Sequence, residues 1–139
     1  MKLYVASSNK LGYKFTNDLL IALHNMNIDI FFPECIGIEA ETLDEMDAVD
    51  AICCKEISNS DVLIAIYPFG YSVSVEIGRF LAYRDMQKER KRCFIILDVS
   101  KKDSELFNKL RSEAMIIPHV DAIVTSTDEL VSELKKHIK

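Results

Sequence analysis

Two continuous apolar segments constrain the fold of this chain most strongly. Val62–Tyr67 and Cys93–Leu97 are almost entirely apolar, and a stretch with helical spacing of apolar residues separates them. A strand that is apolar on both sides is typical of a parallel sheet whose two faces are covered by helices. Two such strands joined by a helix predict a right-handed βαβ unit.

The same alternation of strand and helix extends over the rest of the chain. Capping residues place the start of three helices, because Thr42, Ser74 and Thr127 each precede a helical pattern, and Thr42 is followed by Glu45 in a capping box. Further strands are predicted at Lys2–Ala6, Ile28–Phe32 and Ala122–Thr125, and further helices at Phe15–His24 and Ser104–Met115, with the last helix at Thr127–Ile138. We therefore predict a single domain over residues 1–139, a doubly wound, flavodoxin-like α/β fold. Its five-stranded parallel sheet has the order 2-1-3-4-5 and helices on both faces.

Each predicted helix should turn an apolar stripe toward the sheet. For the helix after Thr42 the stripe consists of Leu43, Met46, Val49, Cys53 and Ile57.

Composition argues against several classes of function. The net charge of −5 argues against binding of a nucleic-acid polymer, and the basic run Lys88–Arg92 is interpreted as the solvated end of a helix. No apolar run approaches the ~18 residues of a membrane span, and no signal peptide is visible. The four cysteines form no C-x-x-C motif and are interpreted as small buried hydrophobic residues in a reducing, cytoplasmic environment. Neither a metal site nor a cofactor is expected, since the histidines lack ligand spacing and the glycine-rich phosphate and dinucleotide motifs are absent.

The predicted strand order indicates where a ligand should bind. In open α/β sheets the crevice lies beyond the carboxyl ends of the first and third strands. Two loops rich in small polar residues follow these strands, and their candidate binding residues are Ser7, Ser8 and Asn9 after the first strand and Gly70, Tyr71, Ser72 and Ser74 after the third. Such loops can hold hydroxyl groups or one phosphate at a helix N-terminus, although ordinary turns have the same composition.

Glu76 is the one carboxylate in this region. With Ser74 as the cap, Glu76 occupies the second position of its helix, where the dipole favours the ionised form and lowers its pKa. An ionised carboxylate at the mouth of a pocket can attack an acetal-like carbon as a nucleophile. The alternative is an acid that only stabilises the first turn of its helix.

The segment around Glu76 resembles a known enzyme family. The run S-D-V-L-I-A-I-Y, then a short loop, then S-V-E-I-G-R-F-L-A-Y is similar to the nucleoside 2-deoxyribosyltransferases and the related nucleoside-monophosphate N-glycosidases. The opening strand with its small-residue loop, Tyr4–Ser8, and the βα order also match. The resemblance implies that Glu76 is the nucleophile that attacks the anomeric carbon of a (deoxy)nucleoside. It implies no cofactor and a homo-oligomeric assembly, with Arg111–Met115 completing the pocket of a neighbouring subunit.

Two departures from the family leave the substrate open. The family's base-contacting aspartate falls at Cys53, and Asp50 is the candidate replacement. The hydroxyl-rich loop is closer to the monophosphate branch, and Lys10 with the serines favours that alternative. Tyr4 and Tyr71 either hold Glu76 by hydrogen bonds or only pack. A nucleotide-binding module without catalysis is the third interpretation, since the aspartate is missing.

Overall fold

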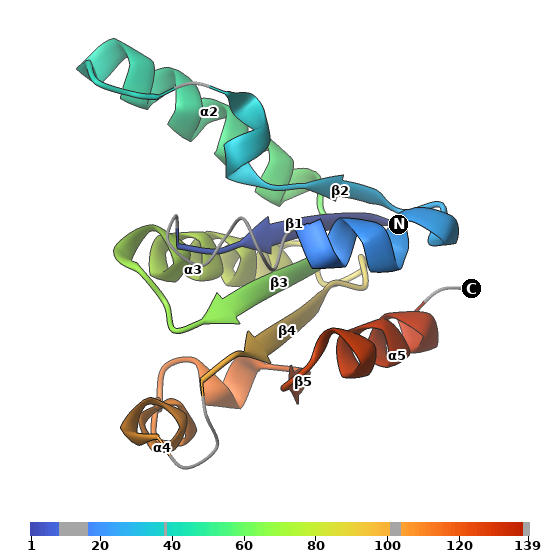
Figure 1. Cartoon of the computed structure of the whole chain (residues 1–139). Helices are drawn as coiled ribbons and strands as arrows, with labels where there is room; N and C mark the ends of the chain where they lie inside the picture. The colour runs from blue at the N-terminus through green and yellow to red at the C-terminus, as the bar shows by residue number, and fades with distance from the viewer. Residues whose placement is uncertain (9–16, 38, 101–103, 138–139) are drawn as a thin grey trace.

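The chain folds into three layers, with a parallel sheet between two layers of helices (Figure 1). A computed structural model describes residues 1–8, 17–37, 39–100 and 104–137. The five strands follow the order β2-β1-β3-β4-β5, and all four pairings are parallel. The predicted fold class and strand order are therefore confirmed.

The strands are close to their predicted positions. They span β1 Lys2–Ala6, β2 Asp29–Phe31, β3 Val62–Tyr67, β4 Cys93–Asp98 and β5 Ala122–Val124. The two central strands, β3 and β4, are buried at every residue, as expected for strands covered on both faces. The edge strands β2 and β5 have three residues each and are one or two residues shorter than predicted.

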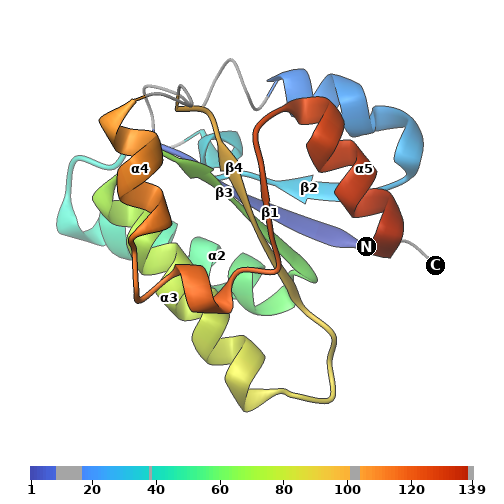
Figure 2. The same ribbon diagram turned by 90° about the horizontal axis from the view of Figure 1, so that it is seen from below.

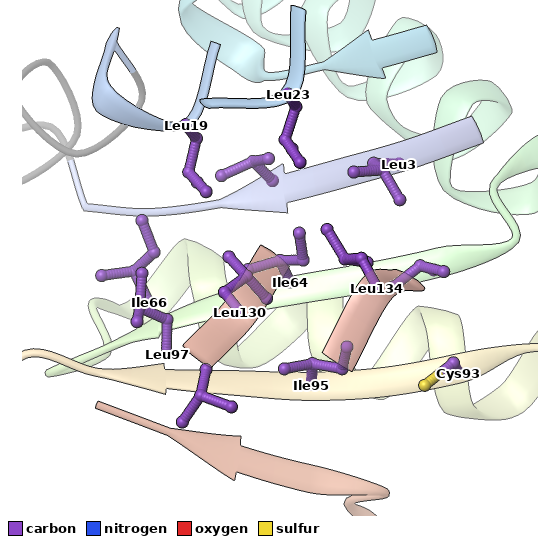
Figure 3. Close-up of a cluster of buried hydrophobic side chains, with 13 residues drawn as sticks. Leu3, Leu19, Leu23, Ile64, Ile66, Cys93, Ile95, Leu97, Leu130 and Leu134 are labelled. Atoms are coloured by element: carbon purple, nitrogen blue, oxygen red, sulfur yellow. The ribbon is translucent and has the colours of Figure 1, made fainter. Parts of the chain in front are cut away.

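Alternation along the strands divides the core into two clusters. On β1, Leu3 and Val5 face the layer formed by residues 17–23 and α5, whereas Tyr4 and Ala6 face the layer formed by α2, α3 and α4. Figure 2 shows the two layers on opposite sides of the sheet, and Figure 3 shows the cluster on the α5 side. The two-residue repeat of a strand therefore turns Tyr4 toward α2 and α3.

The helices on the Tyr4 side begin with α2, Leu43–Asn59, and α3, Tyr71–Met86. Thr42 caps α2 as predicted, and its hydroxyl oxygen accepts a hydrogen bond from the Glu45 amide at 3.2 Å. The apolar stripe predicted on α2 is only partly correct. Cys53 and Ile57 are buried, but Leu43 in the first turn is 77% exposed. The first turns of α2 extend beyond the sheet in Figure 1, so no strand lies beneath them.

The basic run Lys88–Arg92 follows α3, but its arginines bind the C-terminal end of α2. Arg90 donates hydrogen bonds to the Ser58 and Asn59 carbonyls, and Arg92 donates to Ser58 at 2.7 Å. These carbonyls lie in the last turn of α2, where cations are favourable. The interpretation of this run as a solvated end of its own helix is wrong for Arg92, which is 7% exposed.

The last two helices, α4 Glu105–Arg111 and α5 Thr127–His137, differ from the prediction at their ends. α4 ends four residues before Met115 and a 3-10 turn, Ile117–His119, leads to β5. The cap of α5 is Ser126 rather than Thr127, because the Ser126 hydroxyl accepts a hydrogen bond from the Glu129 amide at 3.2 Å. The predicted terminal residue Ile138 lies outside the described part of the chain.

Capping by Ser126 gives a direct test of this helix start. Ser126→Ala is expected to lower the free energy of unfolding by about 1 kcal/mol, because one amide of the first turn loses its acceptor. Thr127→Ala is the matched control and should change it by less than half as much. Urea unfolding of both variants checks the assignment, and a larger loss for Thr127→Ala would contradict it.

The buried thiol of Cys93 makes the stability of the core on the α5 side depend on pH. Its thiol is 8% exposed, and burial, with the nearby Asp121 carboxylate, raises its pKa from 9.0 to about 12. The unfolded chain therefore loses this proton at lower pH than the folded chain, so the contribution of Cys93 is intact below pH 9 and is lost as pH rises toward 12.

Urea unfolding between pH 8 and pH 11 measures this effect. Above pH 9, the stability of the wild type should fall more steeply than that of Cys93→Ala, by about 1.4 kcal/mol per pH unit. Equal slopes for the two proteins would contradict the buried, protonated thiol.

No helix within the described residues is long and apolar enough to cross a bilayer.

Candidate functional site

The candidate site lies where β1 and β3 end side by side. Tyr4 pairs with Leu63 and Ala6 with Ala65, so the loops that follow the two strands leave the sheet at the same edge. A methyl group at Gly70 would lie 3.4 Å from the Ser8 Cβ, so the two loops are in close contact. The two loops therefore meet at the edge of the sheet where the strand order predicts a binding crevice.

The start of α3 differs from the prediction in a way that moves Glu76. The helix is capped by Gly70, in an extended conformation with φ −84° and ψ 176°, and begins at Tyr71 rather than after Ser74. Because Gly70 lies against Ser8, the chain turns into the helix at once, and the Ser74 hydroxyl donates to the Gly70 carbonyl at 3.4 Å. Glu76 is therefore the sixth residue of α3. Its predicted place in the first turn, and the dipole effect argued from it, are wrong, since that effect fades within one turn.

Three side chains from three elements converge beneath this edge. Tyr4 of β1 is fully buried, Glu76 of α3 is 8% exposed, and Cys53 of α2 is 9% exposed. Tyr4 and Cys53 belong to the same buried cluster, and the Glu76 carboxylate lies near enough to Tyr4 to affect its pKa. Burial and the negative charge of Glu76 raise the pKa of Tyr4, so the phenol remains protonated and can donate to the carboxylate.

The hydrogen bonding of the buried Tyr4 hydroxyl is incomplete among the described residues. Among the described residues, none makes a hydrogen bond of full geometry with the buried Tyr4 hydroxyl. A buried hydroxyl in this state costs stability, and such groups concentrate at functional sites. Catalytic hydrogen bonds are often loose without substrate and tighten in the complex. That Tyr4 holds Glu76 by a hydrogen bond stays a prediction.

The hydroxyl-bearing residues are divided between the interior and the surface. Ser7 is 7% exposed at the end of β1 and Ser8 is half-buried against Gly70. Ser72 and Ser74 are exposed on the first turns of α3, and Tyr71 is 97% exposed. The Tyr71 side chain therefore projects into solvent rather than toward Glu76. Asn9 and Lys10 lie outside the described residues.

Asp50, the candidate replacement for an acid at position 53, is engaged by a residue that the sequence did not indicate. Its Oδ1 accepts a hydrogen bond from Arg79 Nη1 at 2.6 Å, and the Cys54 thiol lies 4.0 Å from its Oδ2. Arg79 follows Glu76 by three residues on α3, so the ion pair joins α2 to α3 beside the site. Asp50 is exposed and lies one turn from Cys53, at the surface rather than beside Tyr4.

A second buried acid, Asp98, lies at the same edge of the sheet and was not predicted. It is the last residue of β4, pairs with Tyr67 and is 1% exposed. Its carboxylate accepts hydrogen bonds from the amide and hydroxyl of Ser100 and from Arg111 Nη1 at 3.1 Å. Arg111, expected to reach a neighbouring subunit, is therefore bound within its own chain. The signal in the sequence was weak, since one acid at the end of an apolar strand is common.

A cavity of about 430 Å³ lies at the opposite edge of the sheet, away from these residues. Its wall contains Asp61, Arg92, Cys93, Asp121 and His137, which lie at the amino ends of β3, β4 and β5 or at the end of α5. Both carboxylates are already paired, with Arg90 and Arg84. Among the described residues, no group of three potential ligands could hold a metal ion.

Comparison with known proteins shows what this architecture is similar to. No family model and no curated protein matches the chain. A conserved protein from Enterococcus faecalis V583 superimposes with a TM-score of 0.68 and 16% identity, covering 99% of both chains. A 2-deoxyribosyltransferase from the psychrotolerant bacterium Bacillus psychrosaccharolyticus superimposes with a TM-score of 0.71 and 15% identity, covering 94% of this chain and 90% of the other. The chain thus shares, over nearly its whole length, the fold of a 2-deoxyribosyltransferase.

Proposed function

We propose that the chain is an enzyme that cleaves the N-glycosidic bond of (deoxy)nucleosides by double displacement, with Glu76 as the nucleophile. One observation carries the proposal: a buried carboxylate, Glu76, lies near enough to the buried Tyr4 to raise the pKa of its hydroxyl, below the edge where β1 and β3 end. The fold shared with a 2-deoxyribosyltransferase supports the substrate class.

The reaction balances with the groups at this site. A Glu76 carboxylate oxygen attacks C1′ of the sugar, and the bond from C1′ to the base nitrogen breaks. Its electron pair stays on the nitrogen, which takes up a proton from water. A second base or water then attacks C1′ and releases a proton to water, the ester bond to Glu76 breaks, and the carboxylate is restored. Tyr4 donates to the carboxylate oxygen and holds it in position for both attacks.

Chromatography of the products distinguishes transfer to a second base from hydrolysis in the second step. The protein is incubated with a panel of nucleosides, with and without a second free base. We expect release of the base, together with a new nucleoside when the second base is present. Release of base without any new nucleoside would assign a hydrolase, and no release from any substrate in the panel would overturn the proposal.

A nucleoside 5′-monophosphate is the second candidate substrate. The half-buried Ser8 lies against Gly70, the cap of α3, where the free amides of the first turn can bind a phosphate. Turnover of a deoxynucleoside is compared with that of its 5′-monophosphate, in the wild type and in Ser8→Ala. If the wild type prefers the monophosphate and Ser8→Ala does not, the result supports the monophosphate as the substrate. Equal turnover of the two compounds by the wild type would exclude it.

A module that binds nucleotides without catalysis is the remaining alternative, because a thiol, Cys53, lies where the family's aspartate is expected. Thermal stabilisation by a nucleoside without release of base would support it. Release of base would exclude this alternative.

The resemblance also implies a homo-oligomer, and the surface near the site is compatible with one. Large apolar side chains are exposed on the first turns of α2 and α3, namely Leu43, Met46, Tyr71 and Val75. Exposed apolar side chains of this size can contribute to contacts between subunits. Light scattering on the purified protein measures the assembly, and a monomer would remove this part of the proposal.

A further inference from the structure

We propose that the cavity at the amino ends of β3 and β4 binds the phosphate group of a small metabolite, at a site separate from that of Glu76. Its volume of about 430 Å³ lies in the range of cavities that hold small-molecule ligands. Val62 lies in the cavity wall, whereas Tyr67 ends β3 at the opposite edge of the sheet. The length of β3, about 16 Å, therefore separates the cavity from the loops near Glu76, and the proposal does not depend on the proposed function.

The two acids in the cavity wall are already neutralised. Asp61 is paired with Arg90 at 2.9 Å, and Asp121 is paired with Arg84 at 3.2 Å. Neither arginine belongs to the cavity wall as the described residues form it. The acids therefore leave the positive charges of the wall itself without a partner.

Those positive charges come from one arginine and two lysines. Lys136 pairs with Glu133 at 2.7 Å. Lys91 and Arg92 form no ion pair with any residue that the structure describes. Two cations without a carboxylate partner give the cavity an electrostatic preference for an anion.

Arg92 also has buried hydrogen-bond donors that lack an acceptor. The side chain is 7% exposed, and its Nη2 donates to the Ser58 carbonyl at 2.7 Å and to Gln87 Oε1 at 2.6 Å. Its Nε and Nη1 are buried, and neither has an acceptor among the described residues. Burial and the nearby charge of Arg90 lower the pKa of Arg92, and the charge of Asp61 offsets them only in part. A buried cation in this state is costly, and an oxyanion would supply both the charge and the acceptors that it lacks.

A phosphate group fits these two cations better than a carboxylate does. A phosphate monoester carries roughly two negative charges and three acceptor oxygens, so one oxygen can bind Arg92 and another Lys91. The Nε and Nη1 atoms are shielded from solvent, so we expect the Arg92 guanidinium to turn toward the ligand when it binds. This movement gives the proposal a signature that a merely basic surface would lack.

NMR titration of the ¹⁵N-labelled protein with sodium phosphate tests the proposal, followed through the Arg92 Nε–H resonance and the backbone amides of Lys91 and Cys93. Deoxyribose 5-phosphate and a nucleoside monophosphate are separate arms that distinguish free phosphate from a phosphorylated metabolite. Sodium chloride at equal ionic strength is the control. We expect saturable shifts with at least one phosphate compound, and a melting temperature that rises with its concentration. Shifts that do not saturate, or that sodium chloride reproduces, would overturn the proposal.

Two lysine variants separate a defined site from general attraction. Lys91→Ala is expected to weaken phosphate binding about tenfold, and it should fold normally because Lys91 is exposed. Lys88→Ala is the matched control, since Lys88 is an exposed lysine of the same basic run and does not line the cavity. It should leave the affinity unchanged. An equal loss in the two variants would show attraction to the basic surface as a whole and would overturn the proposal.

Ser8→Ala distinguishes this site from the crevice at the other edge. Phosphate bound at the start of α3 would shift the amides of Gly70 and Tyr71, and Ser8→Ala would weaken that binding. Binding in the cavity should be the same in Ser8→Ala and in the wild type. Shifts confined to Gly70 and Tyr71 would overturn this proposal and leave the proposed function in place. Saturable shifts at Arg92 in a protein that releases no base would uphold the cavity site while the proposed function fails.

Discussion

Replacement of Glu76 by glutamine is expected to lower turnover about 10³-fold or more, because an amide cannot form the ester bond to C1′. The side chain keeps its size and can still accept a hydrogen bond from Tyr4. The variant should therefore fold normally, with a melting temperature within about 3 °C of the wild type. Base release followed by chromatography measures the loss, and thermal unfolding checks the fold.

Asp85→Asn is the matched control for this substitution. Asp85 is an exposed acid on the same helix, nine residues after Glu76, and does not face the sheet. The control should keep wild-type turnover, which would show that loss of one negative charge from α3 does not explain the effect. Turnover near the wild-type level in Glu76→Gln would remove Glu76 as the nucleophile.

Replacement of Asp98 by alanine is expected to cause the largest loss of stability, about 3 kcal/mol. The carboxylate is buried and binds Ser100 and Arg111 from two different segments. Its loss leaves their donors unsatisfied and detaches the C-terminal end of α4 from the end of β4. Urea unfolding measures the change.

A double-mutant cycle with Arg111→Met identifies the source of this loss. Arg111 also stacks on the Phe107 ring, with its guanidinium carbon 3.9 Å from the ring centre, and methionine retains part of that packing. The two substitutions should couple by more than about 1 kcal/mol, since they remove the same ion pair. Additive losses would show that the Asp98–Arg111 contact contributes little to stability.

Features with a strong local sequence pattern were predicted, and features that depend on tertiary contacts were not. β3 was predicted at its observed bounds, Val62–Tyr67, because six successive apolar residues between Asp61 and Pro68 leave little choice. The strand order followed from the repeated βα pattern, and it placed the crevice between β1 and β3. The alternation of β1 turns Tyr4 toward α2 and α3, and its hydrogen bond to Glu76 stays a prediction.

The start of α3 could not be predicted, because a tertiary contact outweighs the intrinsic preference for the competing cap. Ser74 is the better N-cap by intrinsic preference, but Gly70 lies against Ser8 of a loop more than sixty residues earlier in the chain. The ion pairs of Asp50 with Arg79 and of Asp98 with Arg111 were missed for the same reason. Each joins two elements whose side chains meet only after the helices have packed.

The most direct test of the account is to trap the glycosyl-enzyme. The protein is incubated with a deoxynucleoside, and with its 5′-monophosphate, each carrying fluorine at C2′ to slow hydrolysis of the ester, and its intact mass is measured. We predict a gain of one fluorinated sugar, or sugar phosphate, that maps to the peptide containing Glu76 and is absent in Glu76→Gln. Release of base with no adduct, or an adduct on any other residue, would contradict the mechanism.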